Sequence, residues 1–108
     1  MISSNDIDNL HSSFNQSTYA IIIDIDKANL PSSYEEAINN IRQAILPLQF
    51  EGITDKFYLC RAETNQLAFL YLAIQKLSKL SWLQTSLITL KAFKIEDISD
   101  FTNLIKGN

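Results

Sequence analysis

The chain has 108 residues, of which 46% are apolar and 19% charged, with two glycines and two prolines. These proportions predict one compact domain with a hydrophobic core and exclude a disordered chain. The net charge is −3 and the pI is near 4.9. Because proteins that hold nucleic acid by charge usually carry a basic excess, any contact with RNA must use a local patch.

No membrane partner is predicted. The longest apolar run, residues 67–74, has eight residues, whereas a membrane-spanning helix needs about 20. The N-terminus also lacks the basic and apolar segments of a secretory signal. The single cysteine, Cys60, cannot form an internal disulfide, which fits a reducing cytoplasm, and we expect it to be a small buried side chain.

Residues 1–18 are rich in serine and asparagine and predict a polar tail, so the domain should occupy residues 19–108. The lone His11 lies in this tail, where a solvated side chain is the expected state. The domain therefore has no zinc-type spacing of ligands and no Ser-His-Asp set. Any chemistry must rest on carboxylates, lysines and hydroxyls, with or without a divalent cation.

Residues 19–25, YAIIIDI, are apolar and β-branched and predict a buried central strand. Alternation places Asp24 and Asp26 on the same side, about 7 Å apart along the strand. Two such carboxylates can hold Mg²⁺ or Mn²⁺ and so assist phosphodiester cleavage. Strand ends commonly carry aspartate, however, so by spacing alone the polar fringe of a strand is the favoured interpretation.

Residues 31–46 predict a helix that begins with a capping box, formed by Ser32 or by Ser33, and ends at Pro47. Its apolar stripe is Tyr34, Ala37, Ile38, Ile41 and Ile45. Residues 50–60 predict a further extended segment, in which Gly52 and the following residues mark a bend, a bulge or a tight hairpin.

A second helix is predicted from a cap at Thr64 to about Ser78. Its expected core stripe is Leu67, Leu70, Tyr71, Ile74 and Leu77. Further apolar surface comes from Phe69, Leu72 and Ala73. This excess predicts either deep burial within the domain or a homodimer contact.

After a short connection at Trp82, residues 86–95 predict another strand. A short terminal helix should follow, capped by Ser99 or Asp100 and ended at Gly107. The order of elements indicates an α+β sandwich of a modified ferredoxin-like kind, with helices on one face of an antiparallel sheet.

Four stretches together resemble the virulence-associated protein D (VapD) family: YAIIIDIDKANL, the helix-opening Tyr34, LSKLSWLQTS and LKAFKIEDISDFTNLIK. The resemblance covers about residues 19–106. It implies a cytoplasmic homodimer that cleaves RNA as an endoribonuclease and, for several members, a toxin paired with an antitoxin. It also implies that Asp24 is the functional acid, binding a metal ion or positioning the attacking group, with Asp26 in support.

Two short stretches of the sequence depart from the family pattern. Thr54-Asp55-Lys56 stands where the family usually has Gln-Gly-Ser, and Ile88-Thr89-Leu90-Lys91 where it usually has Arg-Asp-Ile-Arg. Lys56 could contact a phosphate, Thr89 keeps a hydroxyl, and Asp55 could replace the lost acid. The alternative is a catalytically impaired dimer that binds RNA or a protein. In either case Lys27, Lys56 and Lys91 are the candidate RNA-binding residues.

Overall fold

The computed structural model describes residues 18–97 and 99–107. Its centre is one antiparallel sheet with the strand order β2-β3-β1-β4. The strands are β1 (Thr18–Ile25), β2 (Phe50–Gly52), β3 (Phe57–Cys60) and β4 (Leu87–Ile95). This order and the helices on one face confirm the predicted ferredoxin-like α+β arrangement. The predicted tail lies outside the described residues, except for Thr18, which belongs to β1.

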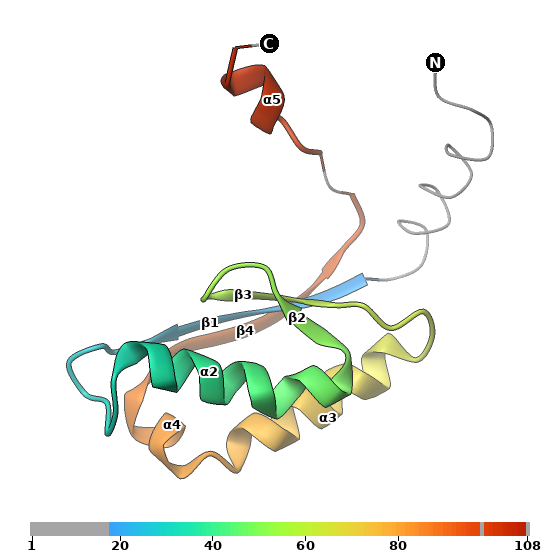
Figure 1. The fold of residues 1–108 in the computed structure, drawn as a ribbon. Coiled ribbons are helices and arrows are strands. Elements are labelled where there is room, and N and C mark those ends of the chain that lie inside the picture. Colours follow the sequence, from blue (N-terminus) through green and yellow to red (C-terminus); the bar gives the residue numbers. More distant parts are fainter. Residues whose placement is uncertain (1–17, 98, 108) are drawn as a thin grey trace.

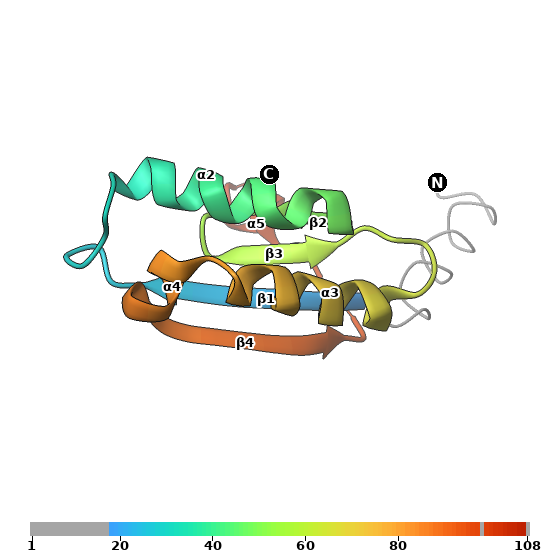
Figure 2. The same cartoon turned by 90° about the horizontal axis from the view of Figure 1, so that it is seen from below.

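Within residues 18–97 and 99–107, helices cover one face of the sheet and no helical layer lies on the other face (Figure 1). They are α2 (Tyr34–Ile45), the 3₁₀ turn η1 (Leu46–Leu48), α3 (Gln66–Ser78), α4 (Ser81–Ser86) and the terminal α5 (Thr102–Ile105). Seen from below, α2 runs on the side of β2 and β3, while α3 lies over β1 and runs along it (Figure 2). Helix α5 stands apart from this layer and buries none of its residues.

Helix α2 begins where the sequence predicts, and the structure selects between the two candidate caps. The Ser33 side chain accepts a hydrogen bond from the backbone N–H of Glu36. This bond satisfies one of the free donors of the first turn, where Glu35 and Glu36 also complement the helix dipole. The cap fixes the start of α2 and therefore the position of Tyr34, its first residue.

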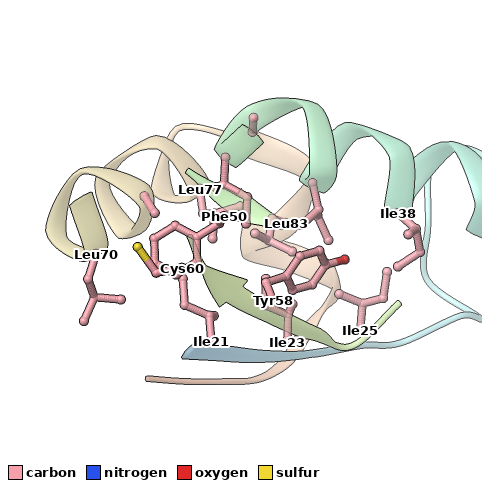
Figure 3. Packing of buried hydrophobic residues seen from close by; sticks show 14 of the residues in the cluster. Ile21, Ile23, Ile25, Ile38, Phe50, Tyr58, Cys60, Leu70, Leu77 and Leu83 are labelled. Atoms are coloured by element: carbon pink, nitrogen blue, oxygen red, sulfur yellow. The ribbon is translucent and has the colours of Figure 1, made fainter. Parts of the chain in front are cut away.

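The hydrophobic core lies between the sheet and helices α2 and α3 (Figure 3). The three isoleucines of β1 that face the helices are at most 5% exposed: Ile21, Ile23 and Ile25. Tyr58 of the neighbouring strand β3 and Leu77 of the covering helix α3 belong to the same buried cluster. Fully burying an aliphatic side chain of this size stabilises the fold by about 1.5–3 kcal/mol. These contacts make β1 a firm support for the residues on its other face.

The extended segment at residues 50–60 forms a hairpin, which settles the alternatives left open by the sequence. Strands β2 and β3 pair with Phe50 opposite Cys60 and Gly52 opposite Tyr58. The connecting residues 53–56 form a short loop at the end of the sheet where β1 also ends. This hairpin brings Lys56 beside Asp24 of β1 and Asp55 beside Tyr34 of α2.

Three local predictions were wrong. Asn65, in the left-handed conformation, precedes α3 without a side-chain cap, so Thr64 is not the cap. Trp82 lies in α4, a short helix fixed by the burial of Leu83, and not in an open connection. Leu67 and Tyr71 were expected in the core but are 46% and 68% exposed, because α3 packs through Leu70, Ala73 and Leu77.

Among the described residues, no helix combines the length and the apolar character that crossing a membrane would require.

Candidate functional site

Asp24 lies near the end of β1, on the face of the sheet that no helix of the described residues covers. Its flanking neighbours Ile23 and Ile25 point into the core, so strand alternation turns Asp24 the opposite way. Thr89 of β4 is its cross-strand partner, and the pairing shifts between Asp24 and Ile25. Such an irregularity bends a strand and changes the aim of a side chain. Asp24 is therefore a partly exposed carboxylate on a rigid central strand.

The ammonium of Lys56 pairs with this carboxylate. The distance from Lys56 Nζ to Asp24 Oδ1 is 3.4 Å, and the two side chains are 54% and 39% exposed. An exposed pair of this kind contributes only about 0–1 kcal/mol to stability. Its importance is therefore its placement, since a carboxylate and an ammonium lie next to each other at the accessible end of strand β1.

The backbone around Lys56 is held by several hydrogen bonds. The Lys56 carbonyl accepts a 2.8 Å bond from the N–H of Ile23, which extends the pairing of β1 and β3 by one step. The Thr54 hydroxyl oxygen accepts from the N–H groups of Lys56 and Phe57, at 3.2 and 3.0 Å. Together these bonds fix the residue that carries the ammonium.

Asp55 anchors the same loop to α2 and β3. The Tyr34 hydroxyl donates a 2.6 Å hydrogen bond to Asp55 Oδ2, and the Tyr58 hydroxyl donates a 2.9 Å bond to the Asp55 carbonyl. The ammonium of Lys27 lies 4.4 Å from the centre of the Tyr34 ring, a cation–π distance. The carboxylate of Asp55 is thus a structural anchor, and Tyr34, predicted only as a core residue, has a second role.

The Tyr34–Asp55 bond changes the proton affinity of both groups. Burial and the bond to the carboxylate raise the pKa of Tyr34 to about 12. The same hydrogen bond lowers the pKa of Asp55. Asp55 therefore stays ionised, and Tyr34 stays neutral, throughout the physiological range.

Replacing Tyr34 by phenylalanine should remove a pH-dependent part of the stability. Because the folded-state pKa of Asp55 is lowered, this contribution is complete at neutral pH and is lost as the pH falls through that pKa. Because the pKa of Tyr34 is raised, it also declines above about pH 10. Urea unfolding at pH 7 and pH 3 checks this, with Tyr71→Phe, on the exposed face of α3, as the control. An equal wild-type advantage at both pH values would contradict it.

Asp26, the second acid of the motif, is engaged in a turn. Its Oδ1 accepts a 3.0 Å hydrogen bond from the N–H of Ala28, and its own N–H donates to the Ser86 carbonyl. The Ser86 hydroxyl in turn donates to the Asn29 carbonyl. Asp26 thus shapes the connection from β1 to α2. This is the usual role of an aspartate whose side chain accepts a hydrogen bond from the backbone N–H two residues later in the chain.

The environments of Asp24 and Asp26 do not suit the predicted binding of a metal ion by these two carboxylates. One oxygen of Asp24 faces an ammonium and one oxygen of Asp26 accepts a backbone N–H. Across the described ranges, no group of three or more acidic, histidine or cysteine side chains is arranged to hold a metal ion. Mg²⁺ prefers several oxygen ligands in octahedral geometry, and a lysine beside the carboxylate opposes a second cation.

The candidate RNA-binding lysines lie around the same end of β1. Lys56 contacts Asp24, Lys27 packs on Tyr34, and Lys91 is exposed on β4 opposite Ile22. On the helix-free face, the rings of Phe57 and Phe93 are stacked with centroids 6.2 Å apart. Three lysines and three aspartates (Asp24, Asp26 and Asp55) therefore lie around this end of β1, on a sheet whose open face carries two stacked aromatic rings.

The residues predicted at a dimer interface have three different environments. Leu72 is 46% exposed, Phe69 packs partly against the core, and Ala73 is fully buried within the chain. Ala73 therefore offers no surface to a second copy, and it lets α3 approach the sheet closely. The exposed apolar side chains on the outer side of α3 are Leu67, Tyr71 and Leu72.

Comparison with known proteins identifies relatives of this chain. No family model matches it. It is 38% identical over 85 residues to the endoribonuclease VapD of Helicobacter pylori, covering 79% of this chain and 90% of that protein. It is 39% identical over 93 residues to the endoribonuclease VapD of Dichelobacter nodosus, covering 82% and 98%.

A third relative is the endoribonuclease VapD homolog of Neisseria gonorrhoeae, 35% identical over 93 residues, which cover 82% of this chain and 99% of that protein. The matches span most of the chain and at least 90% of each relative. On this evidence, the chain belongs to the VapD family.

Proposed function

We propose that this protein is an endoribonuclease and that Asp24 takes part in cleaving the phosphodiester bond of the RNA. The observation that carries the proposal is the Asp24–Lys56 ion pair on the open face of the sheet, in a chain whose relatives are named endoribonucleases. A carboxylate can remove a proton from an attacking hydroxyl, and a neighbouring ammonium can bind the phosphate and stabilise the charge that develops on it.

Lys27, Lys56 and Lys91 hold the RNA backbone in this proposal. Their positions surround the end of β1, whereas the chain as a whole carries a net charge of −3. Phosphate contacts of this kind position RNA without reading its sequence. The stacked Phe57 and Phe93 add a surface on which bases can stack. Asp26 supports the site by shaping the turn that places Lys27.

The family resemblance extends the proposal to the assembly and its setting. We propose a cytoplasmic homodimer in which the open faces of two copies form one cleft containing both Asp24 carboxylates. A role as the toxin of a toxin–antitoxin pair is part of the same proposal. The side chain of Ile22, which is 39% exposed, provides apolar surface beside Asp24 for such a contact.

Cleavage of a circular single-stranded RNA tests this function, because only an endonuclease can open a circle. Wild-type protein should linearise the circle with several turnovers per molecule, while Asp24→Ala should not. Circular dichroism should show that both are folded. Glu63→Ala, exposed in the connection between β3 and α3, serves as the control for loss of one negative charge.

A different result would favour the alternative function. Thr89 stands opposite Asp24 where the family usually has an acid, and this departure fits a dimer that binds RNA or a protein without cleaving it. Intact circles with both proteins, together with binding of the circle by the wild type, would identify a binding module and reject the nuclease.

A further inference from the structure

The ion pair also indicates how the phosphodiester bond is broken. We propose that Asp24 and Lys56 cleave RNA without a divalent cation, by directing the 2′-hydroxyl of one nucleotide against the adjoining phosphorus atom. This inference rests on the ribonuclease function proposed above and specifies its chemistry. In this mechanism the Lys56 ammonium is the cation of the site and has the role that a metal ion has in many phosphoryl-transfer enzymes.

The position of Lys56 is the first support for this inference. Its ammonium lies 3.4 Å from the carboxylate oxygen that a metal would need. A divalent ion bound there would have to displace the ammonium or remain beside it, and the like charges would repel each other. Asp26 gives little help, because one of its oxygens accepts the Ala28 N–H.

The rigidity of the loop is the second support. Lys56 is not a lysine at the tip of a free loop, because the backbone bonds to Ile23 and Thr54 hold it. Asp55 next to it is tied to Tyr34 and Tyr58. A charge that is already in place when the transition state forms stabilises that state without reorganisation. The backbone bonds therefore limit the region that the Lys56 ammonium can reach to the neighbourhood of Asp24.

The reaction balances with these two groups alone. The phosphate enters between the two side chains, which are exposed enough to separate. The Asp24 carboxylate accepts the proton of the 2′-hydroxyl, and the 2′-oxygen forms a bond to phosphorus. The bond from phosphorus to the 5′-oxygen breaks, and the Lys56 ammonium donates a proton to that leaving oxygen. The products are a 2′,3′-cyclic phosphate and a 5′-hydroxyl.

The same contact returns the site to its starting state. After the reaction Asp24 carries the extra proton and Lys56 is a neutral amine. Once the products leave, the two groups return to their 3.4 Å contact and the proton passes from the carboxyl to the amine. No water molecule, oxidant or second cofactor is consumed, since the attacking oxygen belongs to the RNA.

The chemistry of the product ends tests this inference directly. A 5′-labelled single-stranded RNA is cleaved by the full-length wild type in EDTA and, separately, in Mg²⁺. We expect rates within about twofold of each other, fragments ending in 2′,3′-cyclic phosphate by mass spectrometry, and no cleavage where one 2′-deoxynucleotide precedes the scissile phosphate.

Other outcomes separate this inference from the proposed function. Loss of cleavage in EDTA, or fragments with 3′-hydroxyl and 5′-phosphate ends, would overturn the metal-free chemistry and leave the ribonuclease standing if Asp24 is still required. An absence of cleavage under every condition would overturn both.

Substitutions at Lys56 test the proton transfer. Lys56→Met should lower kcat by about 10²-fold or more. Lys56→Arg should keep KM near the wild-type value but not restore kcat, because arginine binds phosphate and does not release a proton. Lys79→Met is the charge-matched control, and all variants should be folded by circular dichroism. Full kcat in Lys56→Arg would show that Lys56 donates no proton and would overturn that step.

Discussion

Asp24→Asn combined with Lys56→Met should slow RNA cleavage no more than the more harmful of the two single substitutions. Each single change should lower the rate by about 10²–10⁴-fold, the usual contribution of a general acid or base. If the two groups act in one step across their 3.4 Å contact, removing either leaves the other without its function. The effects of residues that act as a unit are strongly non-additive.

Single-turnover rates of the wild type, the two single variants and the double variant measure this coupling. Asp24→Asn keeps the size of the side chain, and loss of an exposed ion pair costs about 1 kcal/mol or less, so all four proteins should remain folded. Lys79→Met, at the C-terminal end of α3 and outside the proposed site, is the charge-matched control for Lys56→Met. If the two rate losses multiply in the double variant, Asp24 and Lys56 act independently and the coupled mechanism is wrong.

The coupling also separates the two functions proposed for the chain. A binding module would lose RNA affinity through Lys56→Met and could gain it through Asp24→Asn, because phosphate is repelled by a carboxylate. A nuclease loses turnover with both. Measuring affinity and rate on the same RNA therefore distinguishes a charge that holds the backbone from a charge that takes part in the reaction.

Much of the fold could be predicted because local signals agree with the final packing. The run YAIIIDI predicts a central strand, and Ser33 with Glu36 indicates the start of α2. Four of the five residues of the apolar stripe predicted for α2 are buried: Ala37, Ile38, Ile41 and Ile45. In each case residues close in the sequence determine the element, so periodicity and capping suffice.

The contacts of the candidate site depend on distant parts of the chain. Tyr34 and Asp55 are 21 positions apart, and they meet only because the β2–β3 hairpin has one particular length. The sequence left a bend, a bulge and a hairpin open at Gly52, and these alternatives place Asp55 and Lys56 differently. Register, which alternation does not determine, therefore decided the geometry around Asp24.

Helix α3 illustrates the opposite error, a pattern that predicts more burial than occurs. Its apolar residues surround most of the helix, so the sequence offers several possible core faces. The sheet covers the face that contains Leu70, Ala73 and Leu77, and Tyr71 remains 68% exposed. Which face is chosen depends on how closely the helix approaches the strands, and Ala73, with its small side chain, permits the closest approach.

Ile23→Ala should cost about 2–5 kcal/mol of unfolding free energy, a large part of the stability of a domain of this size. Ile23 is 2% exposed and lies in the core between the sheet and the helices, so its removal leaves a cavity that rigid neighbours cannot fill. Urea unfolding followed by circular dichroism measures the loss. A change below about 1 kcal/mol would show that the core relaxes around the missing atoms.

The adjacent Ile22 provides the matched control, because it has the same side chain on the opposite face and is 39% exposed. In an isolated chain Ile22→Ala should cost about 1 kcal/mol or less, since partly exposed positions lose little on truncation. If two copies associate through the helix-free face, the cost should be larger and should depend on protein concentration. The unfolding free energies of both variants are therefore compared at two protein concentrations. The loss in Ile23→Ala measures how much core packing contributes to stability. The loss in Ile22→Ala tests whether a second copy covers the face that carries Asp24.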